Sequence, residues 1–153
     1  MNNSDNKNQI HTITTVEIKM YYIVYKITNL KNGRFYIGKH STIDINDGYM
    51  GSGTALRQTQ EKLGLKYFKK EILIVCDSEE MMNQAEKIYI KGARYNTPKK
   101  CYNRVNGGGG YKKDPNKIKF SMKDIIEGRV KLTTTEDSTL TSNQYRVVIK
   151  PAA

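Results

Sequence analysis

The chain has 153 residues, which is enough for one ordinary domain and some additional chain. Its 26 Lys and Arg against 15 Asp and Glu give a formal net charge of +11. An integral membrane protein is excluded, because no stretch approaches the roughly 18 consecutive apolar residues of a membrane-spanning helix. The N-terminus also lacks the basic-then-apolar order of a secretory signal. Cys76 and Cys101 are too few for a disulfide-rich secreted scaffold, and no Cys/His zinc pattern is present. We therefore expect a soluble, intracellular, basic protein.

The chain divides by composition into three segments. Residues 1–18 are polar, carry a slight net negative charge and predict a flexible N-terminal arm. Residues 19–106 carry the strongest periodic patterns and predict the central domain. Residues 107–153 predict a basic C-terminal accessory segment, with a short helix near 121–127 and strands near 129–134 and 144–150. The basic charge of the last two segments suits a polyanion, because each Lys or Arg at a phosphate releases a counterion, but it suits solubility or an acidic partner as well.

The central domain opens with two β-branched and aromatic runs that predict strands at 21–28 and 34–38. The Asn-Gly step between the two runs is typical of a hairpin turn. A turn centred between residues 30 and 31 would place Tyr25 directly opposite Tyr36, on one face of the sheet.

The later elements of the central domain follow a regular alternation. A glycine-rich loop precedes a helix expected over 54–63, with Ser52 as its N-cap and Gly64 as its stop. A third strand is expected over 68–75, and a longer helix runs from Ser78 to about residue 94.

One charged residue interrupts the apolar face of that longer helix. Glu86 falls between Ala93 and Ile90 on a helical wheel, and it is the only charged residue in the apolar arc. Burying a carboxylate among apolar neighbours is costly unless a cation or a hydrogen-bond donor meets it. A Glu at the edge of the arc that pairs with a Lys would explain the pattern, and so would a metal ligand or a catalytic group.

Several pieces in order resemble the GIY-YIG nuclease family. They are "YIVY" at 22–25, "YIGK" at 36–39, the helical Glu86 and "YN" at 102–103, and the detail looks closest to phage-type homing endonucleases. The chain has Ile23-Val24-Tyr25 where the family usually has Gly-Ile-Tyr. The resemblance covers roughly residues 21–106.

The resemblance implies an α+β fold with a small three-stranded antiparallel sheet flanked by helices, in β-β-α-β-α order. It also implies a metal-dependent DNA endonuclease that hydrolyses phosphodiester bonds in double-stranded DNA, of homing or phage-defence type. The cofactor would be Mg²⁺ or another divalent cation such as Mn²⁺, bound by Glu86. Such an enzyme would work in the cytoplasm of a bacterial host cell. It would be a monomer if it nicks one strand.

The family resemblance also assigns the catalytic residues. Tyr25 and Tyr36 match the two motif tyrosines. We expect Tyr25 to act as general base toward the attacking water and Tyr36 to position Tyr25. Lys39 would lie near the phosphate as a cation. Gly38 would let the backbone approach the site closely, although a simple end of the strand would also account for it.

The family arginine is missing, since Asn46 stands about where it is expected. His40 is the best local substitute, as a phosphate donor or an acid/base group, and Arg57 is the second. Ser52 belongs to a glycine-rich loop that resembles a phosphate-binding element but is equally typical of an ordinary loop. Asn103 matches the family's late asparagine, which holds the site or contacts substrate.

The missing arginine keeps a second function open. A basic DNA-binding module without catalytic turnover could retain the same fold.

Overall fold

The computed structural model describes residues 10–105, 107 and 114–152, which divide into two compact units. The described residues of the first, here called the sheet unit, are 10–19 and 114–150. Those of the second, the central unit, are 20–105, 107 and 151–152. Strand β1 (His11–Asn29) contributes residues to both units. Among the described residues, no helix is long and apolar enough to cross a membrane.

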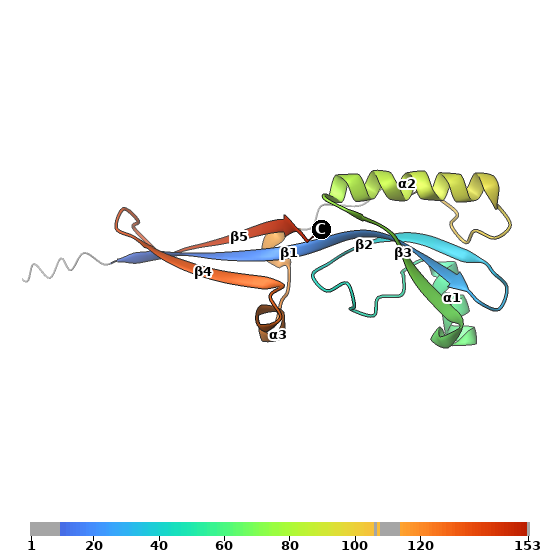
Figure 1. Ribbon diagram of the computed structural model, residues 1–153, viewed down its shortest axis with the longest axis horizontal. Coiled ribbons are helices and arrows are strands. Elements are labelled where there is room, and N and C mark those ends of the chain that lie inside the picture. Colours follow the sequence, from blue (N-terminus) through green and yellow to red (C-terminus); the bar gives the residue numbers. More distant parts are fainter. Residues whose placement is uncertain (1–9, 106, 108–113, 153) are drawn as a thin grey trace, which may run out of the picture. The chain divides into compact units, whose positions relative to one another are not determined.

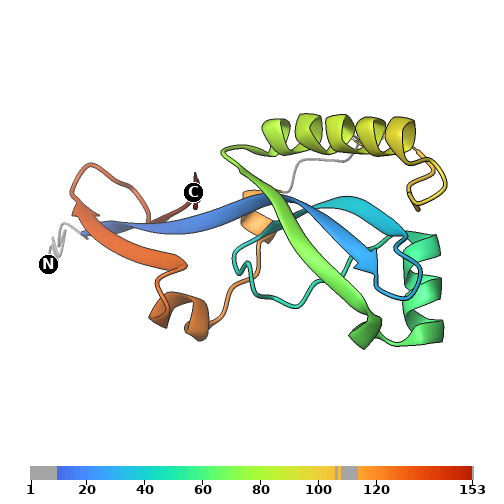
Figure 2. The ribbon, with the colours of Figure 1, turned by 45° about the vertical axis from the view of Figure 1, so that its right-hand side comes forward.

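The central unit is an antiparallel sheet between two helices. Its strand order is β2-β1-β3, with β2 at Phe35–Thr42 and β3 at Phe68–Cys76. Helix α1 (Thr54–Leu63) and helix α2 (Glu79–Asn96) lie on opposite faces of the sheet (Figures 1 and 2). A single helical turn, η1 (Leu65–Tyr67), leads from α1 into β3.

The alternation of side chains along β1 gives each helix its own core. Odd-numbered residues of the strand pack with α1, in a cluster of Ile23, Tyr25, Ile27, Leu56 and Phe68. Even-numbered residues face α2, in a cluster of Val24, Ile37, Cys76, Met82 and Ile90. A strand buried on both faces explains why the sequence there is almost continuously apolar.

The hairpin register differs by two residues from the predicted one. Tyr25 pairs with Gly38, and Ile27 pairs with Tyr36, so the two tyrosines are diagonal neighbours on one face. A tight turn at residues 30 and 31 would require positive φ angles at two non-glycine residues. The chain instead takes a positive φ of 72° at Gly33, which moves the turn further along the chain.

The sheet has five strands rather than the three expected, although the α+β class with an antiparallel sheet flanked by helices is confirmed. Strands β4 (Val130–Asp137) and β5 (Gln144–Pro151) both pair with β1. β4 is antiparallel to residues 11–18, so the prediction of a flexible arm was wrong for these residues. Residues 1–9 lie outside the described part of the chain.

The remainder of the sheet unit is short and helical. It consists of the single turn η2 (Pro115–Lys117) and α3 (Met122–Ile126), which precede β4. Thus the three elements expected in the C-terminal segment are present as a helix and two strands.

The helix ends follow local capping chemistry, with one exception. The Ser78 side chain accepts the Met81 amide at the start of α2, and Gly64 ends α1 with a φ of 94°. The N-cap of α1, however, is Gly53, which offers no side-chain hydrogen bond. The prediction of Ser52 as this cap was therefore wrong.

A side-chain amide completes the exposed edge of β2. Asn103 accepts the Ile37 N–H at 2.8 Å and donates to the Ile37 carbonyl at 2.7 Å. Just before it, Phe35 exchanges backbone hydrogen bonds with Lys100 and Tyr102. Asn103 thus takes the place of a neighbouring strand and satisfies both backbone groups of Ile37.

We expect Asn103→Ala to lower the free energy of unfolding by about 1–3 kcal/mol, because it leaves an amide and a carbonyl of the edge strand without their partner. Urea denaturation would measure the change. The matched control is Asn46→Ala at an exposed loop position, where we expect a change of no more than about 0.5 kcal/mol. Equal effects of the two substitutions would contradict the assignment.

Candidate active site

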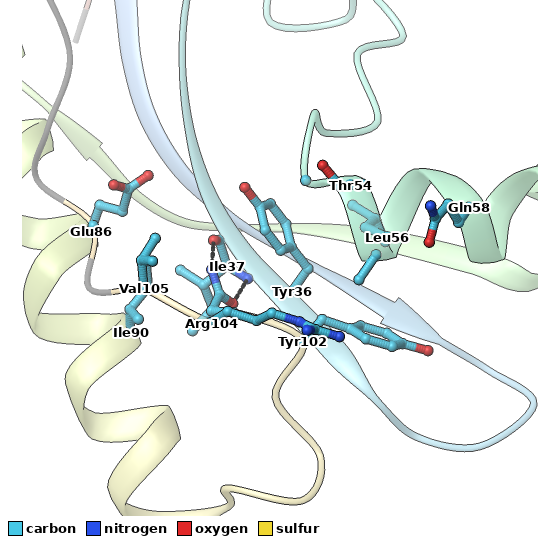
Figure 3. A pocket seen from close by; sticks show the side chains of 14 residues that line it. Tyr36, Ile37, Thr54, Leu56, Gln58, Glu86, Ile90, Tyr102, Arg104 and Val105 are labelled. Carbon is cyan, nitrogen blue, oxygen red and sulfur yellow. Dashed lines mark hydrogen bonds between the residues drawn. The ribbon is translucent and has the colours of Figure 1, made fainter.

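A pocket of about 490 Å³ lies at the edge of β2. Because β2 is the outer strand, side chains from both faces of the sheet reach this pocket. Figure 3 shows the Glu86 carboxylate and the Tyr36 hydroxyl pointing into the same space, from α2 and β2 respectively. The lining is completed by Ile37, Gly53, Thr54, Ala55, Leu56, Gln58, Ile90, Tyr102, Asn103, Arg104, Val105 and Gly107.

Glu86 is the buried acid that the helical pattern singled out. It is 7% exposed and lies on the same stripe of α2 as Met82 and Ile90. The Gly107 backbone lies against it so closely that a Cβ there would come within 2.1 Å of a carboxylate oxygen. The carboxylate is therefore seated at the pocket wall and is not a solvated edge residue.

Gly38 separates the two motif tyrosines. A Cβ at this position would come within 2.3 Å of the Tyr25 hydroxyl oxygen and 2.8 Å of the Tyr36 ring. The ring centroids are 6.3 Å apart with a tilt of 42°. Glycine is therefore required by the close approach of β2 to both rings, since its φ is not in the left-handed region.

The two tyrosines have different surroundings. Tyr25 is 1% exposed, and burial, with a hydrogen bond to Tyr49, raises its pKa far above the ordinary value. Burial also raises the pKa of Tyr36, as does the charge of Glu86, while a hydrogen bond from Ser52 lowers it. Both phenols consequently hold their protons at neutral pH in this structure. The Tyr36 hydroxyl, unlike that of Tyr25, borders the pocket.

A second group of polar side chains, the histidine cluster, consists of His40, Thr42, Asp47 and Tyr49. The His40 Nε2 lies 2.6 Å from a carboxylate oxygen of Asp47, and the imidazole stacks on the Tyr49 ring at 3.9 Å and 10°. Thr42 donates to the same carboxylate at 2.9 Å, and the Tyr49 amide donates to its other oxygen at 3.0 Å. The imidazole is thereby held at its Nε2 edge by Asp47 and on its ring face by Tyr49.

Lys70 links the histidine cluster to the tyrosine pair. Its ammonium donates to the Tyr49 carbonyl at 2.7 Å and lies 5.3 Å from the Tyr25 ring centroid. Burial lowers the pKa of Lys70, although Asp47 acts in the opposite direction. A half-buried cation therefore faces the aromatic side of the site.

The structure does not bring every predicted site residue to the pocket. Lys39 points to the α2 side of the sheet and donates to Asn83. Arg57 is exposed on α1 and is not among the described residues that line the pocket. Asn103 is at the pocket, where it positions β2, and Ser52 contacts Tyr36.

His40 shares a face of β2 with Tyr36 and Gly38, but it is four residues from Tyr36. At about 3.3 Å per residue, their Cα atoms are about 13 Å apart. His40 is therefore close to the site without sharing the pocket with Glu86.

Sequence reasoning missed four residues near the site. Asp47, Tyr49 and Lys70 surround the aromatic group, and Arg104 lines the pocket. In Figure 3 the Arg104 side chain points away from Glu86, toward the Tyr102 side of the pocket. Of these four, only Arg104 could have been identified from the sequence, because it directly follows the "YN" pair.

The donor set at the pocket fits only one kind of metal. Among the described residues, no group of three or more His, Cys, Asp and Glu could hold an ion. Glu86 offers a hard oxygen ligand in a pocket with room for water and a phosphate. This suits Mg²⁺, which keeps several waters and needs one or two carboxylates, and does not suit a zinc site.

We expect Gly38→Ala to destabilise the fold by about 1–3 kcal/mol, because the new methyl group would displace the Tyr25 and Tyr36 rings. Gly92→Ala is the matched control, since a Cβ there would meet nothing within 4 Å. Removing that glycine from the interior of α2 should stabilise the protein by about 0.5–1 kcal/mol. Thermal unfolding of both variants measures the difference, and a stabilised Gly38→Ala protein would disprove the close approach.

The stability contributed by Asp47 should depend on pH. Burial alone would raise the pKa of Asp47, but hydrogen bonds from His40, the Tyr49 amide and Thr42 outweigh it and lower the pKa below the ordinary 3.8. An Asp47 pKa that is lower in the folded than in the unfolded state stabilises the fold at pH values above the unfolded-state pKa. This stabilisation is lost as the pH falls through the folded-state pKa.

Urea unfolding should therefore show that Asp47→Asn destabilises the protein at neutral pH and that its difference from wild type shrinks below about pH 3.8. Asp77→Asn, at an exposed position, is the matched control for removal of a carboxylate charge. A difference between wild type and Asp47→Asn that is constant across this range would contradict the network.

Comparisons with known proteins find similarity to phage proteins that are named as endonucleases. It is 45% identical over 92 residues to "Putative endonuclease segB" of Enterobacteria phage T4, a match that covers 60% of this chain and 42% of that protein. It is 44% identical over 92 residues to "Putative endonuclease segD" (60% and 41%) and 41% identical over 92 residues to "Endonuclease segA" (60% and 42%), both of the same phage. No family model and no solved structure matches. The chain is thus similar to less than half the length of each of these phage endonucleases.

Proposed function

We propose that this chain is a DNA endonuclease of the GIY-YIG type that hydrolyses phosphodiester bonds with the help of a divalent cation. The observation that carries the proposal is the buried Glu86 carboxylate, which shares a pocket with the Tyr36 hydroxyl. The similarity to phage endonucleases supports the same activity. The net positive charge of +11 suits a nucleic-acid substrate.

Glu86 is the residue that we propose as the ligand of Mg²⁺ or Mn²⁺. When bound, such an ion polarises the scissile phosphate and a water molecule. The carboxylate is seated among Met82, Ile90 and the Gly107 backbone, at the wall of the pocket in which the cation would be held. Neutralising the Glu86 charge would also remove one of the causes that raise the pKa of Tyr36.

Of the two tyrosines, we propose that Tyr36 contacts the attacking water and that Tyr25 positions Tyr36. This reverses the assignment made from the sequence. Tyr36 borders the pocket and accepts a hydrogen bond from Ser52, which favours its ionised form. Tyr25 is 1% exposed and bonded to Tyr49, so water has little access to it. In this proposal the Tyr36 phenol first releases its own proton to solvent, which neutralisation of the Glu86 charge favours, and the phenolate oxygen then receives the proton of the water.

His40 is proposed to contact a phosphate next to the scissile one. Its distance from Tyr36 along β2, about 13 Å between Cα atoms, is too long for both to act on one phosphorus atom. The Asp47 carboxylate beside its Nε2 would favour a charged imidazole, which is the form that binds phosphate. Arg104, at the pocket itself, is then the better candidate to replace the missing family arginine.

A chain with one such pocket would cut one strand at each encounter. We therefore propose nicking of double-stranded DNA by a monomer, inside the bacterial host cell. Paired cuts would need a second copy or a second binding event.

The test is incubation with supercoiled plasmid that carries a cleavage site, with and without Mg²⁺. We expect relaxed circles with wild type and a loss of at least about 100-fold in rate with Glu86→Gln, because a neutral amide binds the cation weakly. Glu80→Gln removes an exposed carboxylate from the same helix and should leave the rate unchanged. Gel electrophoresis separates relaxed, linear and supercoiled forms.

Each product of this assay has one meaning. Linear product would show paired cuts and contradict nicking by a monomer. Cleavage that persists in EDTA would contradict the proposed dependence on a divalent cation. A plasmid that is retarded in a gel but never cut would favour the non-catalytic DNA-binding module. Equal activity of Glu86→Gln and Glu80→Gln would disprove the proposed site.

A further inference from the structure

The three strands of the sheet unit carry their basic residues on one face. Lys19 on β1 and Lys131 on β4 belong to the same face, because the register pairs Glu17 with Lys131 and side chains alternate along each strand. Lys150 on β5 forms an ion pair with Glu17 at 3.2 Å, so it lies on this face too, and Arg146 lies four residues before it. We call this surface the basic face; it comprises Lys19, Lys131, Arg146 and Lys150.

The opposite face has different chemistry. Its residues include Val16 and Ile18, which are buried, and Thr14 and Thr134, which contact each other through their hydroxyl groups at 3.3 Å. Glu136 is its only charged residue on β4. The segregation of cations to one side is therefore a property of this sheet and does not follow from overall composition.

The basic face is open to solvent. Lys19, Lys131 and Arg146 are exposed, and none of the three forms an ion pair within the described residues. Its two carboxylates are already engaged, Glu17 with Lys150 and Asp137 with the Thr139 hydroxyl. Three cations thus remain available to an outside partner.

We propose that the basic face binds duplex DNA along its major groove. The inference deepens the proposed function, on which it rests for the choice of DNA as the partner. Three strands at about 4.8 Å spacing are about 10 Å across, close to the groove width of about 12 Å. Lys131 and Arg146 on the outer strands would meet phosphates, and the exposed Thr133 and Thr135 side chains on the same face of β4 would face the base edges.

The test measures DNA binding separately from cleavage, by fluorescence anisotropy of a labelled random-sequence duplex in EDTA with the full chain. Each phosphate contact contributes about an eightfold factor near 0.1 M salt and about 0.9 to the slope of log K against log salt. Lys131→Gln with Arg146→Gln should therefore weaken binding about sixtyfold and lower the slope by about 1.8.

The sharper comparison is between two neighbouring residues of β4. Thr133→Glu adds a negative charge to the basic face, whereas Thr134→Glu adds the same charge to the opposite face, and both positions are exposed. We expect Thr133→Glu to weaken binding about tenfold, and Thr134→Glu by less than about twofold. Circular dichroism checks that both variants fold.

Equal effects at the two positions, or a larger effect of Thr134→Glu, would overturn the inference while leaving the plasmid assay unaffected. An RNA duplex that competes as well as DNA would also overturn it, because the major groove of RNA is too narrow and deep for a sheet. Binding that depends on Thr133 in a protein that never cuts plasmid would support this face and disprove the proposed enzyme.

Discussion

The arrangement of the site depends on the missing side chain at Gly38. Because β2 presents only backbone there, the Tyr25 and Tyr36 rings close over it from two adjacent strands, although they are not directly paired. The Tyr36 hydroxyl is thereby held at the pocket with a second phenol behind it. A methyl group at this position would have to push one ring out of the site, so the glycine sets the geometry of both tyrosines.

The position of β2 at the sheet edge is what lets one pocket combine groups from both faces. Tyr36 belongs to the face covered by α1, whereas Glu86 comes from α2 on the other face. In a central strand these groups would be separated by the sheet. An exposed edge normally leaves backbone groups unpaired, and here the Asn103 amide pairs those of Ile37, so the edge is ordered where it forms the pocket wall.

Local patterns predicted most elements, and contacts distant in sequence account for the missed start of β1. Helix α1 and its stop at Gly64 were predicted residue by residue, since periodicity and capping are local. The start of β1 was not, because its polar Thr-rich pattern becomes a strand only through β4, with Thr14 meeting Thr134 across 120 residues. Glu86 could be found because a helical wheel shows a charged residue on an apolar face, where burial of a carboxylate is costly. Asp47 lies in a polar loop, where an acidic residue is ordinary and indicates nothing.

The length of β2 separates two chemistries that the sequence places four residues apart. At one end of β2, Tyr36 on its α1 face lines the same pocket as Glu86 from α2. At the other end of the α1 face lies an imidazole that Asp47 and Tyr49 hold in place. A small-molecule substrate would not need both ends. A nucleic-acid strand that runs along β2 would, under the proposed function, place regularly spaced phosphates at both ends at once. Under the proposed function, specificity for an extended substrate then follows from the rigidity of one strand.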